Sequence, residues 1–75
     1  MNIKIKIGLR IKELRKVKGF SQETLAGEAD LDRTYINSVE NGKRNISIEN
    51  IEKISKALKI SLSDFFKDQK FNNNR

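Results

Sequence analysis

The sequence predicts an all-α domain made of five short helices joined by tight turns. Three observations predict this class: the 75 residues contain no proline, they contain only four glycines, and their apolar side chains recur at helical spacing. The chain is too short for two cores, so residues 1–75 are expected to form one domain with its core at about 7–66. Such a chain buries only about 60% of its unfolded surface, so it is expected to gain stability from a partner.

The composition excludes several classes of function. The chain has no cysteine and no histidine, so it lacks disulfides, thiolate chemistry, the commonest general base and the commonest metal ligand. No glycine-rich phosphate loop or metal-ligand spacing is present either. We therefore expect no enzyme activity, no cofactor and no metal site.

The charge favours a polyanionic partner. Lys and Arg number 16 against 10 Asp and Glu, which gives a net charge of +6. Nucleic acid or an anionic membrane surface fits this balance, and solubility alone is the plain alternative. No apolar run approaches the roughly 18 residues of a membrane span, and the first residues lack the apolar block of a signal peptide. The expected location is the cytoplasm, with no membrane partner.

The first helix is predicted to end at Gly19, a left-handed terminator. One face carries apolar residues at helical spacing, namely Ile3, Ile7, Ile11 and Leu14. Ile5 and Leu9 project to the opposite face, so either they contact another chain or this stretch is a short extended arm. We expect helix from Ile7 onward and leave the conformation of residues 3–6 open.

Four further helices are predicted from their N-caps, because a serine or aspartate oxygen accepts from an unpaired N–H of the first turn. The capping residues are Ser21, Asp32, Ser47 and Ser61. The predicted helices follow them, at residues 22–29, 33–40, 48–58 and 62–67. Asp30 is expected to take the left-handed conformation in a tight turn between the second and third helices. Residues 68–75 are expected to form a frayed polar tail.

Two short helices separated by a tight turn are typical of a helix-turn-helix unit, whose second helix lies in the major groove of DNA. At about 100° per residue, Ile36 and Val39 of that helix point inward. The residues that point outward are Arg33, Thr34, Asn37 and Ser38. These side chains suit base edges and phosphates, and no acid that would repel phosphate lies among them.

Three stretches also resemble a known family in order and spacing, namely residues 21–26 (SQETLA), 31–36 (LDRTYI) and 39–44 (VENGKR). They resemble the phage Cro/CI-type, XRE-like helix-turn-helix family, which implies a lambda-repressor-like fold over about residues 7–66. Within it, residues 31–36 and 40–45 are most similar to the controller proteins of restriction–modification systems. The family often has glycine in the turn where this chain has Asp30.

The resemblance implies roles at the positions it matches. Arg33 matches the principal base reader, and Gln22 matches a residue that binds phosphate and braces the recognition helix. Arg15 and Glu40 match a pair that joins the first helix to the third. Together with the outward face, the resemblance makes further DNA contacts expected at Thr34, Tyr35, Asn37, Ser38, Lys43, Arg44 and Asn45. The alternative for each is an ordinary solvated, packing or turn residue.

The expected function is that of a sequence-specific DNA-binding regulator that acts as a homodimer on a near-palindromic operator. The resemblance implies activation of its own gene and an endonuclease gene at low dose and repression at high dose; a contact with RNA polymerase stays open. The expected dimer interface comprises Ile60, Leu62, Phe65 and Phe66, unless both phenylalanines belong to the core. Two alternatives remain: a phage-type repressor or antitoxin-like autorepressor, and a protein-interaction module without a DNA target.

Overall fold

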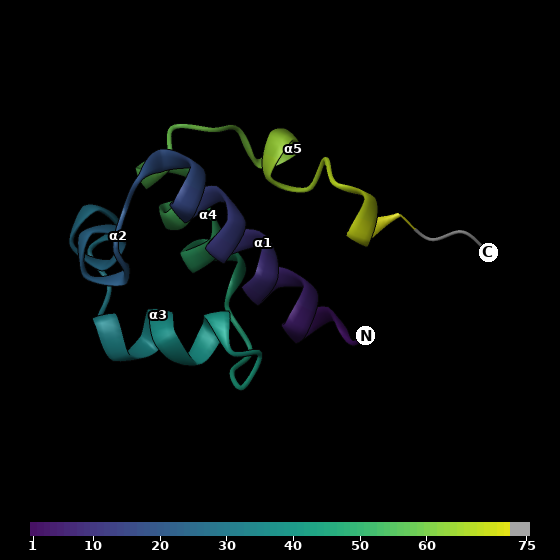
Figure 1. Ribbon diagram of the computed structural model, residues 1–75, viewed down its shortest axis with the longest axis horizontal. Helices are drawn as coiled ribbons and strands as arrows, with labels where there is room; N and C mark the ends of the chain where they lie inside the picture. The colour runs from purple at the N-terminus through teal and green to yellow at the C-terminus, as the bar shows by residue number, and fades with distance from the viewer. Residues whose placement is uncertain (73–75) are drawn as a thin grey trace.

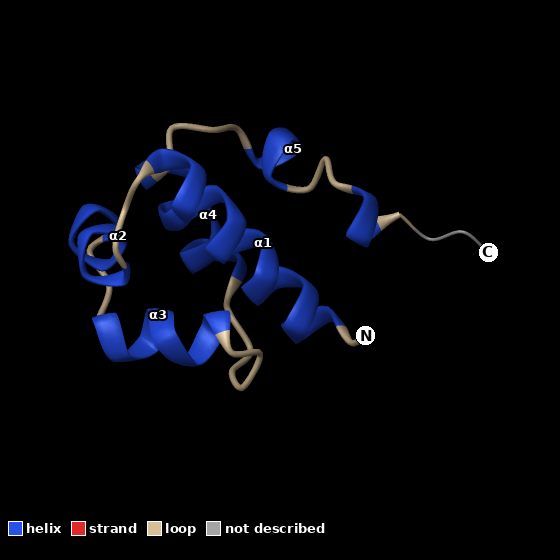
Figure 2. Cartoon of the chain, in the orientation of Figure 1, coloured by secondary structure: helices blue, strands red, loops and turns tan. Residues whose placement is uncertain are grey.

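The computed structural model describes residues 1–72, which fold as helices around one apolar core (Figure 1). The elements are α1 (Ile3–Lys18), α2 (Gln22–Ala29), α3 (Arg33–Glu40), α4 (Ile48–Ala57), α5 (Leu62–Phe65) and a 3₁₀-helix, η1 (Gln69–Phe71). Figure 2 shows loops as the only other structure in this part of the chain. The predicted all-α class with five α-helices is confirmed. None of the described helices is long and apolar enough to cross a membrane.

The predicted caps are present. The side-chain oxygens of Ser21, Ser47 and Ser61 accept hydrogen bonds of 3.0, 3.0 and 2.9 Å from backbone N–H groups in the first turns of α2, α4 and α5. Asp32 does the same for α3 at 3.1 Å. Asp30 adopts φ 57°, so an aspartate supplies the left-handed turn between α2 and α3.

Two helix boundaries differ from the prediction by two residues or more, and α4 ends at Ala57, one residue before its predicted end. α1 begins at Ile3 rather than Ile7, because the side chain of Asn2 accepts a 3.0 Å hydrogen bond from the Ile5 N–H and caps the helix earlier. Residues 3–6 are therefore helical and not an extended arm. α5 ends at Phe65, two residues before the predicted end.

The predicted frayed tail is wrong for its first part. Asp68 caps η1 by accepting a 2.9 Å hydrogen bond from the backbone N–H of Lys70. Phe71 packs against the core from this short helix. Residues 73–75 of the predicted tail lie outside the described residues.

The core lies between α1, α2, α3 and α4, and α5 closes one end of it. Its largest fully buried side chains are Phe65, Ile11, Leu25, Ile36, Ile54 and Val39. Phe65 has no exposed surface, so it is a core residue and cannot contact a second chain in this conformation. The expectation that Phe65 belongs to the dimer interface is therefore wrong. Phe65 is the last residue of α5 and its ring faces the interior, whereas Phe66, the C-cap that follows it, is 40% exposed.

The backbones of α1 and α3 meet at Gly8. A methyl group on Gly8 would overlap the carbonyl oxygen of Val39 and would lie 2.8 Å from that of Glu40. Only glycine allows this approach, and it fixes where the end of α3 sits on α1.

Candidate nucleic-acid interface

Helix α3 lies along one edge of the molecule and is fixed there by its inner face (Figure 1). Ile36 and Val39 are 0% and 1% exposed, as the spacing predicted. On the opposite face, Arg33, Thr34 and Asn37 are exposed. α3 therefore presents a row of donor and acceptor side chains that the core does not use.

A buried ion pair anchors the C-terminal end of α3. The Arg15 Nε–H donates to Glu40 Oε2 at 2.6 Å, and Nη2 donates to Oε1 at 3.0 Å. A third donor of Arg15 bonds the Phe20 carbonyl at 2.8 Å. The hydrogen bond to Glu40 raises the pKa of the Arg15 guanidinium and outweighs its burial. The bidentate geometry joins α1 to α3, as the resemblance implied.

The polar contacts continue from this pair to the exposed face. The Gln22 Nε2 donates to Glu40 Oε1 at 3.0 Å, and its Oε1 accepts from Asn37 Nδ2 at 3.1 Å. Asn41 Nδ2 then donates to Asn37 Oδ1 at 3.2 Å. Two expected DNA contacts, Gln22 and Asn37, are thus brought together and held in fixed orientations. Asn41 belongs to the same network and was not predicted from the sequence.

A second group lies where α4 meets α3. The Tyr35 hydroxyl accepts a 2.9 Å hydrogen bond from Asn50 Nδ2, and the Arg44 guanidinium lies 5.1 Å from the centre of the Tyr35 ring. Tyr35 and Arg44 are both expected site residues, and the structure brings them into contact. Asn50 was not a candidate, because a polar residue in the first turn of a helix carries no signal of a tertiary contact.

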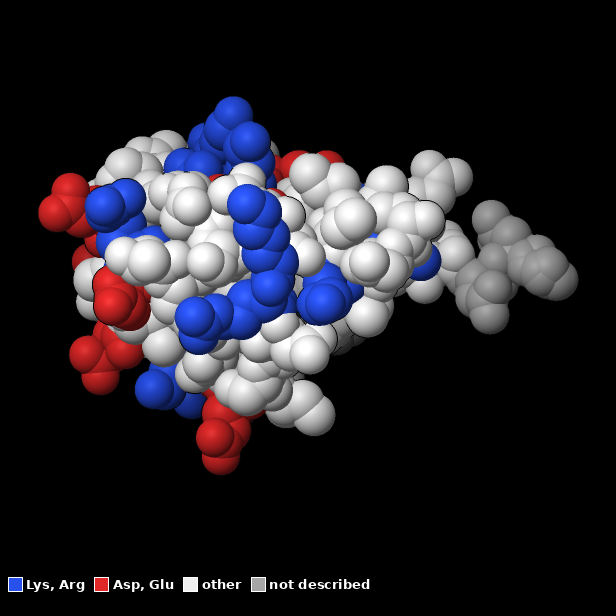
Figure 3. Space-filling view, turned by 90° about the horizontal axis from the view of Figure 1, so that it is seen from below, with Lys and Arg blue, Asp and Glu red and all other residues white. Residues whose placement is uncertain are grey.

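The loop after α3 adds positive charge to the same side. Lys43, Arg44 and Asn45 are exposed, whereas Ser38 is half-buried. Figure 3 views the molecule from the side on which α3 lies and shows basic side chains in a band across the middle, with most acidic ones toward the rim. Such a band gives a positive potential that attracts a phosphate backbone.

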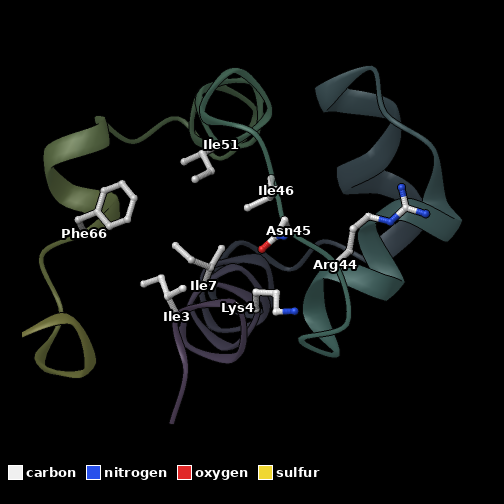
Figure 4. A pocket seen from close by; sticks show the side chains of 8 residues that line it. All are labelled: Ile3, Lys4, Ile7, Arg44, Asn45, Ile46, Ile51 and Phe66. Carbon is white, nitrogen blue, oxygen red and sulfur yellow. The ribbon is translucent and has the colours of Figure 1, made fainter.

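An apolar groove of about 200 Å³ lies beside this loop. Figure 4 shows around it side chains from α1, from α4, from the loop between α3 and α4, and from Phe66, the C-cap of α5. The lining residues are Ile3, Lys4, Ile7, Arg44, Asn45, Ile46, Ile51 and Phe66. Of the expected dimer residues, Phe66, the C-cap of α5, lines the groove, and Leu62 is exposed at the start of that helix. Ile60 is half-buried against the core. Among residues 1–72, no group of acidic side chains is arranged to hold a metal ion.

Comparisons with known proteins agree with this geometry. A family model described as helix-turn-helix matches residues 11–65. The control protein C.MunI of a Mycoplasma species is 56% identical over 68 residues, which cover 89% of this chain and 92% of that protein. The structure of the restriction–modification controller protein C.AhdI from Aeromonas hydrophila matches with a TM-score of 0.81 and 49% identity, over 84% of this chain and 96% of that chain.

A further similar structure shows the controller protein C.Esp1396I as a tetramer in complex with its natural 35-base-pair operator. It matches with a TM-score of 0.83 and 41% identity, over 88% of this chain and 87% of that chain. These relatives are transcription controllers and not enzymes. The chain belongs to the helix-turn-helix family and, within it, to the DNA-binding controller proteins of restriction–modification systems.

Proposed function

We propose that this protein binds a near-palindromic operator as a homodimer in the cytoplasm, with one α3 in the major groove of each half-site. The observation that carries the proposal is the exposed polar face of α3, which is fixed to the core by Ile36 and Val39. One such helix reads only a few base pairs, so two copies related by a dyad are needed to read half-sites about 34 Å apart. The operator complex of C.Esp1396I supports an assembly of several chains on DNA.

Within this arrangement, Arg33 reads a base and its neighbours hold the backbone. Arg33 is exposed at the first turn of α3, where side chains of a recognition helix meet base edges. Thr34, Asn37 and Ser38 follow it along the outward side of the helix. The phosphate contacts come from Gln22, Tyr35, Lys43, Arg44 and Asn45.

The second copy occupies the apolar groove. Ile3 and Phe66 line it and are 59% and 40% exposed, and Leu62 at the start of α5 is 38% exposed. A second copy that covers these apolar side chains removes them from water, which favours association. A dyad-related copy presents the same residues to its partner, which gives a self-complementary contact. The groove shares Arg44 and Asn45 with the DNA-facing loop, so dimer formation and DNA binding involve adjoining surfaces.

In the cell, this dimer activates its own gene and an endonuclease gene at low dose and represses both at high dose. The resemblance to controller proteins supports this role, and activation requires a contact with RNA polymerase. A transcription assay over rising protein concentration tests the role. Repression at every concentration would contradict it.

The DNA-binding proposal is tested by fluorescence anisotropy on duplex from upstream of the protein's own gene, with scrambled duplex as competitor. We expect at least about 10³-fold preference for the operator and a steep fall of affinity with salt. Arg33→Ala is expected to cost about 1–3 kcal/mol on the operator and to relax preference at one base.

Arg44→Ala is the matched control, because it also removes one exposed guanidinium. It is expected to weaken binding to all sequences alike and to flatten the salt dependence. If both variants lose the same affinity for operator and for scrambled DNA, Arg33 does not read a base. Weak and equal binding of the wild-type protein to both duplexes would instead favour a protein partner.

A further inference from the structure

We propose that Asn50 is a positioning residue for DNA binding. Its side-chain amide orients the Tyr35 hydroxyl, and the Tyr35 ring in turn positions the Arg44 guanidinium through a cation–π contact. This inference rests on the proposed function, because it assigns Asn50 a part in the phosphate contacts of that surface. The three residues come from α4, α3 and the loop between these helices, so the assembly exists only in the folded chain.

The backbone of Asn50 is itself fixed. Its N–H donates a 3.0 Å hydrogen bond to Oγ of Ser47, the N-cap of α4. The side chain is half-buried and donates from Nδ2 to the Tyr35 hydroxyl at 2.9 Å. Water competes less for a half-buried hydrogen bond, so this contact fixes the hydroxyl more firmly than an exposed pair would.

The direction of that hydrogen bond determines what Tyr35 offers to DNA. An amide Nδ2 can only donate, so the tyrosine oxygen accepts there and its own proton is left for another acceptor. Within residues 1–72, the Tyr35 hydroxyl makes no second hydrogen bond. A phosphate oxygen is an acceptor of the required kind, and hydroxyl donors commonly bind it.

Arg44 adds a charge to the same assembly. Its guanidinium lies 5.1 Å from the centre of the Tyr35 ring, within the range of a cation–π contact. Arg44 is otherwise an exposed loop residue, so the ring limits where its charge can lie. A shift of the tyrosine therefore moves both a hydroxyl donor and a guanidinium away from their phosphates.

A double-mutant cycle on operator affinity tests the role of Asn50. The variants are Asn50→Ala, Tyr35→Phe and their combination, compared by anisotropy with the wild-type full chain. Asn50→Ala is expected to weaken binding about fivefold, the equivalent of one hydrogen bond of about 1 kcal/mol. In the Tyr35→Phe background, the same change is expected to alter affinity less than twofold, because the hydroxyl through which it acts is gone.

The control is Asn72→Ala, which removes an exposed asparagine amide from the C-terminal segment, defined here as residues 64–72. This variant is expected to bind like the wild type. Thermal melts establish that each variant is folded at the temperature of the assay. A purely structural Asn50 would lower the melting temperature and leave operator affinity unchanged, which would overturn the proposal, as would losses that add in the cycle. If the wild-type chain shows no preference for the operator, the proposed function fails instead, so the two failures are distinguishable.

Discussion

Helix α1 contacts two parts of this molecule, one through buried contacts and the other through partly exposed polar contacts. Toward α3 it uses buried contacts: the backbone approach at Gly8 and the ion pair of Arg15 with Glu40, whose residues are 8% and 6% exposed. Toward the C-terminal segment it uses partly exposed contacts. Arg10 donates to the carbonyl oxygens of Phe65 and Asp64 at 2.7 and 2.8 Å.

The remaining links to the C-terminal segment are ion pairs. Arg10 lies 3.2 Å from Asp68, and Lys70 lies 2.9 Å from Glu13. A further pair, between Lys70 and Asp68 at 2.8 Å, lies within the segment itself. Buried charges cost several kcal/mol when one partner is lost, whereas exposed pairs contribute about 1 kcal/mol or less each. The comparison teaches that α1 is joined to α3 by buried contacts, whereas its links to the C-terminal segment, apart from the buried Phe65 ring, are partly exposed polar contacts that solvent conditions can alter.

The largest effect is expected from Glu40→Ala. This change leaves the Arg15 guanidinium buried without its carboxylate and removes the partner of Gln22, so it is expected to cost about 3–5 kcal/mol of unfolding free energy. Urea denaturation measures the loss. Glu13→Ala is the control, since it removes one exposed carboxylate from an ion pair and is expected to cost about 1 kcal/mol or less. Similar losses for both variants would abolish the contrast between the two sides of α1.

A pair of glycine substitutions is expected to have the next largest effect. Gly8→Ala places a methyl group against the carbonyl oxygens of α3 and is expected to destabilise by about 1–3 kcal/mol or more. Gly27→Ala is the matched change in α2, where no atom lies within 4 Å of the new methyl group. It is expected to stabilise by about 0.5–1 kcal/mol, because alanine is the better helix former. Thermal melts compare the two, and a stabilising Gly8→Ala would show that α1 and α3 are not in close contact.

The parts of the fold that follow local rules could be predicted from the sequence. Ser21, Asp32, Ser47 and Ser61 cap their helices because capping depends on the cap and its own first turn. The inward and outward faces of α3 followed from helical geometry in the same way. The earlier start of α1 also has a local cause, the cap at Asn2, which the alternation of isoleucine and lysine obscured.

The features that depend on distant neighbours could not be predicted. Gly8 sits inside a helix with no turn signal, and only the position of α3 makes its missing side chain necessary. Asn50 meets Tyr35 only after α3 and α4 have both packed on α2. The choice between Phe65 and Phe66 for the core depended on where α5 ends. The exposed polar face of α3 was therefore predicted from the sequence, whereas the hydrogen bonds by which Asn41 and Asn50 hold Asn37 and Tyr35 were not.

The smallest effect is expected at the C-terminal segment, from Asp68→Asn. Asparagine still caps η1 through its side-chain oxygen, so the change removes the charge and keeps the cap. The hydrogen bond from Lys70 and the nearby charge of Arg10 hold the pKa of the Asp68 carboxyl below its usual 3.8. Burial alone would lower the pKa of Lys70, but its hydrogen bonds to Asp68 and Glu13 raise it, so Lys70 stays charged from neutral pH down through the acid range.

The lowered pKa fixes the sign of the pH dependence. A carboxyl whose pKa falls on folding stabilises the fold fully above its unfolded value of 3.8, and this contribution disappears as the pH drops through the lower folded value. Asp68→Asn is therefore expected to melt slightly below the wild type at pH 7, and the difference is expected to vanish as the pH falls well below 3.8. Lys67→Ala, a change at an exposed lysine just after α5, is expected to show no such convergence. A constant difference between wild type and Asp68→Asn across this range would mean that the charge of Asp68 does not hold the C-terminal segment on α1.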